Sequence, residues 1–149
     1  MFCFKRFYYY NQSLILGNGS YVYIEASSPA RVGQKSKLIS PAFNSSVSGT
    51  NCLSFYYHMY GAFMGSLKAH VKGVGVVLWT KSGNQGNRWL YDEFEIKSST
   101  SFRVTFTSIR GSSATGDSAL DDIRVTPGNC SGNILLTYRS VLRGYLGIF

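Results

Sequence analysis

Three of the seven acidic residues fall within six positions of the sequence, and their carboxylates are potential oxygen ligands. They are Asp117, Asp121 and Asp122, in a segment rich in glycine and serine. Calcium prefers carboxylate and carbonyl oxygens, so this segment is a candidate calcium site. The alternative is structural: Asp121 or Asp122 caps backbone amides and pairs with an arginine such as Arg110 or Arg124. The sequence alone leaves both interpretations open.

Cysteine and histidine do not point to catalysis or to zinc. The three cysteines are Cys3, Cys52 and Cys130, and an odd number leaves at least one thiol unpaired within the chain. The two histidines, His58 and His70, do not combine with the cysteines in a zinc-site spacing. No Gly-x-Ser-x-Gly nucleophile motif is present either. We therefore expect a protein that is not an enzyme and has no firmly indicated cofactor.

Asparagine triplets of the glycosylation type occur several times. Asn44 is the best candidate, because it begins a polar stretch that is rich in serine, glycine and asparagine. Asn18 and Asn11 are further candidates. Asn129 also fits the pattern, but Cys130 stands at the centre of its triplet, and a disulfide there would hinder its use.

The chain of 149 residues has the length of one domain and a formal net charge of +8. Such an excess of positive charge favours an anionic partner, such as nucleic acid, a heparan-type glycan or a membrane surface. Along the sequence, however, the basic residues are scattered, and many fall on the polar sides of strand-like segments. No basic cluster is interleaved with stacking aromatics. We therefore expect solvated basic faces and no nucleic-acid partner.

No apolar run reaches the roughly 20 residues that a bilayer span requires, so we expect no direct membrane insertion of this segment. The first residues include Lys5 and Arg6, but polar residues at 11–13 interrupt the apolar run that follows. A secretory signal needs a continuous apolar stretch, so the sequence shows no clear signal peptide.

Alternation of apolar and polar residues predicts an all-β fold. In the segment 102–110, Phe102, Val104 and Phe106 fall on one side, which is the pattern of a half-buried strand. Leu53, Phe55 and Tyr57 are expected in the same core. The expected strands are residues 21–25, 37–40, 52–60, 66–72, 74–80, 89–97, 102–110 and 119–126. Short strands without helical segments between them favour an antiparallel β-sandwich.

Five motifs, taken in order, resemble the MAM domain, a module named after meprin, the neuropilin antigen and receptor protein tyrosine phosphatase mu. They are Tyr23–Ser27, Leu38–Pro41, Cys52–Gly61, Ser82–Trp89 and Gly116–Ile123. The resemblance implies a jelly-roll type β-sandwich over residues 17–132. Residues 1–16 are then an atypical N-terminal segment, and residues 133–149 are an atypical C-terminal tail.

The resemblance also implies chemistry at particular residues. Cys52 and Cys130 match two family cysteines that form a disulfide, which requires an oxidising compartment; the alternative is two buried, reduced cysteines. Cys3 lies near an N-terminal cysteine pair of the family, but its partner is missing. Relatives hold a cation near the acidic segment with help from N-terminal acidic residues. Lys5 and Arg6 stand there in this chain, so any calcium binding is expected to be weak.

The function implied by the resemblance is non-catalytic recognition and adhesion outside the cell or at its surface, within a membrane-associated parent protein. Such a module binds other proteins of the cell surface or matrix, and binding to copies of itself is one form that this recognition can take. A second interpretation is a glycan-binding jelly roll, which an exposed Trp79 or Trp89 near the acidic segment would favour. An accessory domain of a secreted or membrane protease is a third interpretation, and a truncated gene product is a fourth.

Overall fold

The structure is a computed structural model that describes residues 2–3, 8–10, 13–15, 21–24, 29–72, 77–113 and 115–131. All regular elements among these residues are β-strands, as the alternation of the sequence predicts. None of the described segments forms a helix that is long and apolar enough to cross a membrane.

The strands follow one another along the chain with short connections. Their bounds are β1 Phe2–Cys3, β2 Tyr8–Tyr10, β3 Ser13–Ile15, β4 Val22–Ile24, β5 Lys35–Ile39, β6 Thr50–Tyr60, β7 Ser66–Lys72, β8 Val77–Ser82, β9 Leu90–Lys97, β10 Arg103–Ile109 and β11 Asp117–Pro127. The expected strands are all present, and most have shifted ends. One such shift is at β11, which begins at Asp117 rather than Ala119 because Asp117 pairs with Tyr60 across the sheet.

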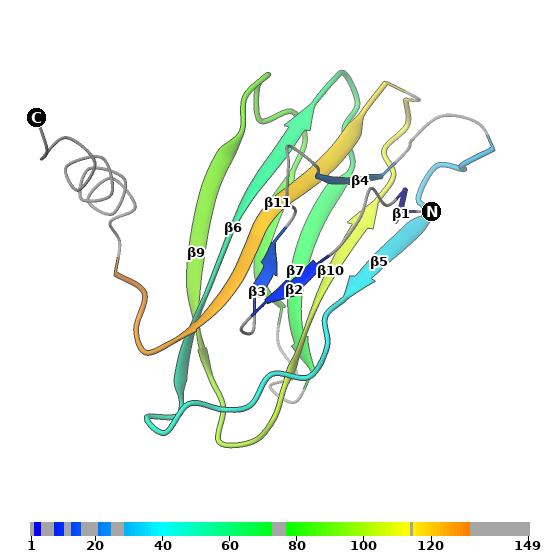
Figure 1. Cartoon of the computed structure of the whole chain (residues 1–149). Helices are drawn as coiled ribbons and strands as arrows, with labels where there is room; N and C mark the ends of the chain where they lie inside the picture. The colour runs from blue at the N-terminus through cyan, green and yellow to red at the C-terminus, as the bar shows by residue number, and fades with distance from the viewer. Residues whose placement is uncertain are drawn as a thin grey trace, which may run out of the picture.

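Two antiparallel sheets face each other (Figure 1). The seven-stranded sheet contains the order β4-β11-β6-β9, and the short strands β1, β2 and β3 are added beyond β4 and β11. The four-stranded sheet has the order β5-β10-β7-β8. Consecutive strands from β4 to β11 therefore alternate between the sheets, except for the β7–β8 hairpin, and this order is that of a jelly roll. The expected jelly-roll type β-sandwich is confirmed.

The core lies between the two sheets and is built from the residues that alternation selected. Leu53, Phe55 and Tyr57 on β6 are no more than 3% exposed, and so are Val104 and Phe106 on β10. Phe102, just before β10, is equally buried. The neighbouring Arg103 is exposed, so the predicted strand register is confirmed.

Phe55 occupies the centre of this core. Its ring meets Phe106 at 4.9 Å and Trp79 at 5.0 Å between centroids, both in edge-to-face geometry. Phe55 belongs to the larger sheet, whereas Phe106 and Trp79 belong to the smaller one. These contacts therefore join the two layers, and each aromatic pair contributes about 0.5–1.5 kcal/mol beyond the burial of its area.

Replacing Phe106 by alanine should lower the free energy of unfolding by about 3–5 kcal/mol, because it opens a cavity against Phe55 that the sheets cannot close. The matched control is Val32→Ala at an exposed position, which should change stability by no more than about 0.5 kcal/mol. Urea unfolding of the two variants measures both effects. A Phe106→Ala variant as stable as the control would contradict the central packing of the two sheets.

Candidate functional site

The outer face of the larger sheet carries a group of aromatic side chains that the strand register brings together. On β11, Ala119 lies opposite Tyr23 of β4 on one side and opposite His58 of β6 on the other. Asp117 lies opposite Tyr60 in the same way. Since side chains at every second position of a strand share a face, these residues form one continuous surface.

The loop 83–89 adds a tryptophan to this surface. Its backbone is fixed to the end of β6, because the amide of Gln85 donates to the carbonyl oxygen of Met59 at 2.8 Å. Gly83 and Gly86 have φ angles of 74° and 91°, which residues with a Cβ rarely adopt. This glycine-studded turn therefore positions Trp89 beside β6.

The rings contact one another in a chain. Trp89 lies 5.5 Å from Tyr21 and 5.5 Å from His58, measured between ring centroids. The His58 ring also shares a hydrogen bond of 3.2 Å with the side-chain oxygen of Asn87. We call Tyr21, Tyr23, His58, Tyr60 and Trp89 the aromatic cluster. Three of its members remain well exposed: Tyr21 at 46%, Tyr60 at 49% and Trp89 at 41%.

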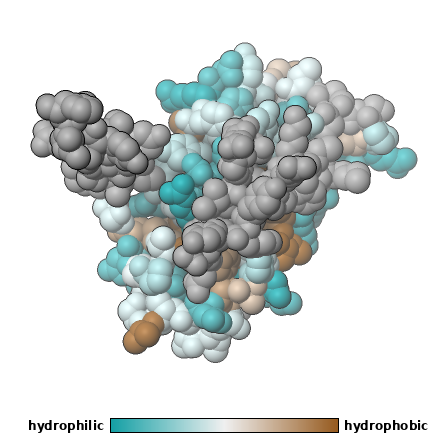
Figure 2. Space-filling view, in the orientation of Figure 1, coloured by the Kyte–Doolittle hydropathy of each residue, from teal (hydrophilic) through white to brown (hydrophobic). Residues whose placement is uncertain are grey.

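A shallow hollow of ≈ 350 Å³ lies within this surface. Its lining combines rings with a carboxylate and a hydroxyl, and consists of Tyr21, Tyr23, His58, Tyr60, Thr115, Asp117 and Ala119. Rings and polar groups of this kind suit stacking and hydrogen bonding to a ligand. On the coloured part of the face shown in Figure 2, hydrophobic areas are small and separated by hydrophilic ones.

The three aspartates of the predicted calcium site are not brought together. Asp117 and Asp121 are four residues apart on β11, a distance of about 13 Å along an extended strand. Two oxygens that bind the same calcium ion lie no more than about 5 Å apart, because each is about 2.3–2.6 Å from the ion. Asp117, Asp121 and Asp122 therefore do not fit one ion as a set. Weak calcium binding by the domain stays a prediction.

Asp121 and Asp122 make the structural contacts of the alternative interpretation. The Asp121 carboxylate accepts a hydrogen bond of 2.8 Å from the amide of Asp122, and Asp122 pairs with Arg124 at 3.3 Å. A β-bulge interrupts the pairing of β11 with β6 here, and Asp122 has a φ of 47°. Burial raises the pKa of Asp121, and the neighbouring charge of Asp122 adds to the effect.

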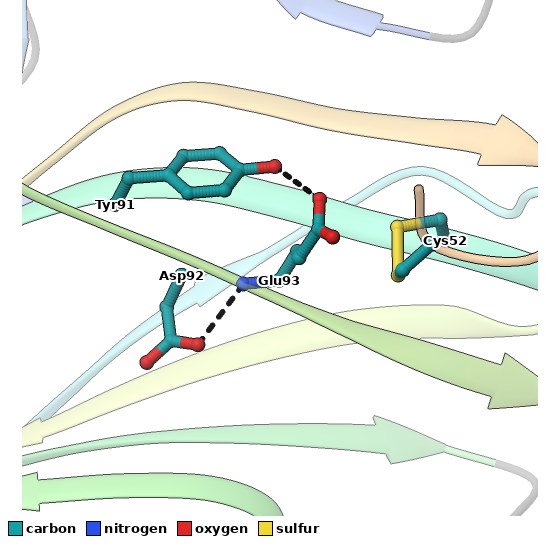
Figure 3. The surroundings of a disulfide bond; sticks show 5 residues. Cys52, Tyr91, Asp92 and Glu93 are labelled. Carbon is teal, nitrogen blue, oxygen red and sulfur yellow. Dashed lines mark hydrogen bonds between the residues drawn. A yellow bond between two sulfur atoms is a disulfide. The ribbon is translucent and has the colours of Figure 1, made fainter. Parts of the chain in front are cut away.

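The cysteines implied by the family resemblance are joined. Cys52 on β6 and Cys130 after β11 form a disulfide with an S–S distance of 2.01 Å and a sequence separation of 78 residues (Figure 3). In the chain-entropy model a loop of this length contributes about 4 kcal/mol of stability. The pairing prediction is confirmed, and the structure contradicts the alternative of two reduced cysteines.

A carboxylate stands beside this disulfide. Tyr91 and Glu93 extend from the same side of β9, and the Tyr91 hydroxyl donates to Glu93 (Figure 3). A carboxylate oxygen of Glu93 and the two sulfur atoms lie within 4.8 Å of one another. Burial and this contact raise the pKa of Tyr91, so the phenol stays protonated. Both sulfurs are in a covalent bond, so this group is not a ready metal site.

Trp79 is held inside the sandwich instead of on the surface. It is 9% exposed, and its ring nitrogen donates to the Asp92 carboxylate at 2.7 Å. Lys81 also reaches Asp92, at 3.6 Å. Asp92 points away from the side of β9 that carries Tyr91 and Glu93 (Figure 3). Of the two tryptophans considered for ligand binding, only Trp89 is therefore available.

The remaining predicted residues lie apart from this surface or outside the described part of the chain. Asn44 is exposed, as a glycosylation site requires, and its modification stays a prediction. Asn11 and Asn18 lie outside the described residues. The short strand β1 contains Cys3, whose backbone pairs with Tyr23 of β4. His70 lies on β7, in the sheet opposite the one that carries His58.

Sequence reasoning did not identify the aromatic cluster, although each member belonged to a motif or strand already noted. The available signal was that two strands carry aromatic residues at alternate positions, Tyr21 and Tyr23 in one and His58 and Tyr60 in the other. Whether those two sides face the same way depends on the pairing of both strands with β11, which no local pattern specifies.

The comparisons with known families and curated proteins confirm the family resemblance. The family model described as "MAM domain, meprin/A5/mu" matches residues 3–131. This range includes most of residues 1–16, which lie outside the five motifs that carry the resemblance. The boundaries proposed for the domain and the tail therefore remain expectations.

Curated relatives match most of this chain. It is 39% identical over 142 residues to MAM domain-containing glycosylphosphatidylinositol anchor protein 2 of Homo sapiens, covering 87% of this chain and 15% of that protein. It is 40% identical over 117 residues to MAM domain-containing glycosylphosphatidylinositol anchor protein 1 of Gallus gallus, covering 75% and 12%. For thyroid hormone-induced protein B of Xenopus laevis the values are 41% over 120 residues, 77% and 17%. The chain thus spans a small part of each relative.

Among solved structures, the chain is similar to a family 16 carbohydrate-binding module-2. The TM-score is 0.48 and the sequence identity 8%, with 77% of this chain and 85% of the other covered.

Glu93→Gln should speed reduction of the Cys52–Cys130 disulfide by roughly threefold, because a nearby carboxylate disfavours both an attacking thiolate and the thiolate that leaves. The rate of thiol release in dithiothreitol, followed by alkylation and mass spectrometry, measures this effect. Asp117→Asn removes a carboxylate elsewhere on the larger sheet and is the control. Equal rates in the Glu93→Gln variant and the control would show that Glu93 has no influence on the sulfurs.

Asp121→Asn should stabilise the domain near neutral pH. The raised pKa means that the folded state disfavours the ionised carboxylate, so the wild type gains stability as pH falls through the folded pKa. The advantage of the variant should therefore be greatest near neutral pH and shrink as the pH is lowered. Thermal melts from neutral pH downward test it. Asp117→Asn is the control, because it removes a carboxylate from the same strand four positions away from Asp121. A difference that does not depend on pH would contradict the prediction.

Proposed function

The chain belongs to the MAM domain family, and from that premise we propose that it is a non-catalytic recognition module that acts outside the cell or at its surface. Two relatives are named as glycosylphosphatidylinositol anchor proteins, which supports a cell-surface setting for the parent protein. The Cys52–Cys130 disulfide supports an oxidising compartment. Because the chain spans a small part of each relative, it would contribute one module to a longer protein.

The exposed aromatic cluster is the observation that carries this proposal. Tyr21, Tyr60 and Trp89 present large rings with polar groups at their edges, and they are held by the sheet and by the loop that is fixed to β6. Tyrosine and tryptophan are enriched in protein interfaces, where they give large contact areas with little loss of side-chain entropy. The proposed partner is a second protein, either a different protein or another copy of this chain.

His58 supports a binding role for this surface. Its ring nitrogen is hydrogen-bonded to the amide side chain of Asn87, and its ring packs against Trp89. An imidazole held in this way helps to fix the orientation of the tryptophan ring. Asp117 and Thr115, in the same hollow, would supply directional polar contacts that distinguish one partner from another.

A glycan is the second candidate ligand, and one observation favours it. Trp89 is exposed, and it contacts Tyr21 and His58, which line the hollow together with Asp117. An aromatic face next to a carboxylate is suited to a sugar ring, which has apolar C–H groups and hydroxyls. An exposed tryptophan near the acidic segment is also the feature expected from the sequence of a glycan-binding jelly roll.

Trp89→Ala should weaken binding of the domain to cells that carry the partner by about 30-fold, the loss expected for an aromatic at the centre of an interface. Val47→Ala is the matched control, since Val47 is an exposed apolar residue that belongs to neither sheet. Flow cytometry with fluorescent domain measures cell binding, and aggregation of domain-coated beads tests self-association. Circular dichroism checks that each variant is folded.

Enzymatic treatment of the cells distinguishes the two candidates. The part of the binding that depends on Trp89 is the part to compare. If it is lost after protease treatment but survives glycosidase treatment, the result supports a protein partner on the aromatic cluster, and the opposite result supports a glycan there. Equal binding of the Trp89→Ala variant, the control and the wild type would remove the aromatic cluster from the proposal.

A further inference from the structure

Charge is divided between the two sheets of the sandwich. All carboxylates among the described residues lie on the larger sheet, on β9 and β11: Asp92, Glu93, Glu95, Asp117, Asp121 and Asp122. The described strands of the smaller sheet carry no acidic residue, while they carry Lys35, Lys37, Lys68, Lys72, Lys81 and Arg103. The basic residues that look scattered along the sequence are therefore gathered by the fold.

Five of these basic residues share the outer face of the smaller sheet. The strand registers place Lys37 and Lys68 on either side of Thr107, and place Arg103 opposite Lys72. Lys35 lies two positions before Lys37 on the same side of β5. We call Lys35, Lys37, Lys68, Lys72 and Arg103 the basic face.

The basic face is a grid with regular spacing. Lys37 and Lys68 are separated by one intervening strand, which puts their backbones about 10 Å apart. Lys68 and Lys72, on one strand, are about 13 Å apart, and His70 lies between them on the same side. A linear polymer with repeated negative charges could therefore contact several of these side chains at once.

A hollow of ≈ 440 Å³ runs over this grid. Its lining includes Lys35, Lys37, Lys68 and Lys72, together with hydroxyls and the ring of His70. The hydroxyls belong to Thr105 and Thr107 on the central strand β10. The lysine ammonium groups offer positive charge to an anionic ligand, and the threonine hydroxyls between them offer hydrogen bonds.

Within the described residues, no carboxylate neutralises this face. The ion pairs Lys81–Asp92 and Arg124–Asp122 both lie elsewhere. Arg103 donates one hydrogen bond of 2.9 Å, to the carbonyl oxygen of Ser40, and that contact does not cancel its charge. The positive potential of the basic face is therefore exposed to the solvent.

We propose that the basic face binds a linear sulfated polysaccharide of the glycosaminoglycan type. The proposed extracellular setting is the reason to choose a glycan over nucleic acid, and the composition of the face agrees with this choice. Binding of single-stranded nucleic acid uses aromatic rings for base stacking, and the hollow has none apart from His70. A strongly anionic lipid surface is a property of the cytoplasmic leaflet and is not expected outside the cell.

The proposed site is separate from the aromatic cluster. The basic face is the outer side of the β5-β10-β7-β8 sheet, whereas the aromatic cluster lies on the outer side of the opposite sheet. The two proposals can therefore fail independently, because variants of one surface leave the other unchanged.

The experiment compares two variants that lose the same charge. Lys37, Lys68 and Lys72 are replaced by glutamine in one variant, and Arg88, Lys97 and Arg124 in the other. Affinity for heparin is measured by surface plasmon resonance at several salt concentrations. The basic-face variant should bind roughly 10- to 100-fold more weakly, and the slope of log affinity against log salt should fall by about two to three. The control variant should bind within about threefold of the wild type.

Three further probes identify the ligand chemistry. Chemically desulfated heparin should bind much more weakly than heparin, because sulfates supply most of the proposed contacts. Duplex DNA and phosphatidylserine vesicles serve as the other polyanions. Tighter binding of either one, with the same dependence on the three lysines, would overturn the choice of a sulfated glycan. An equal loss in the control variant, or no heparin binding at low salt, would overturn the site itself.

Discussion

The packing of Phe55 against Phe106 and Trp79 is the contact on which the rest of the molecule depends. It joins the central strand of the larger sheet to the smaller sheet, and all three rings are buried. A domain of this size has one core, so the side of β6 that carries Phe55 must face inward. Trp79 adds a polar constraint, because its ring nitrogen needs the Asp92 carboxylate of β9. The two layers are thus fixed by both apolar packing and a hydrogen bond.

This constraint determines what the surface displays. Because strand side chains alternate, burying Phe55, Tyr57 and Met59 places His58 and Tyr60 outside. The same rule on β10 buries Val104 and Phe106 and directs Arg103 toward the solvent. A slip of one residue would exchange the two sets and bury charged groups in the core. The aromatic cluster and the basic face therefore both follow from the same packing of the two sheets, and they lie on opposite sides of the sandwich.

Local patterns in the sequence were sufficient for the strands and for the core. The clear alternation in 102–110 identified Phe106 as buried, and the motifs of the family implied the Cys52–Cys130 disulfide that the structure contains. Local patterns were insufficient to predict surfaces that are formed by several strands. Asp117 was grouped with Asp121 because they are near in sequence, yet an extended strand separates their side chains and brings Asp117 to Tyr60 instead. The basic residues looked scattered because β5, β7 and β10 are far apart in the chain and are neighbours only in the sheet.

The division of charge has a consequence for how the two surfaces would work together. A polyanion that approaches the larger sheet would meet the carboxylates of β9 and β11, whereas the described strands of the smaller sheet carry no acidic residue, so its attraction is directed to one side of the sandwich. Screening limits such effects to about 8–10 Å at physiological salt, so the anion would influence the opposite face little. A partner on the aromatic cluster would therefore not compete with it. The sandwich separates the two binding chemistries because the charged side chains lie on the outer side of the smaller sheet and the aromatic rings lie on the outer side of the larger sheet.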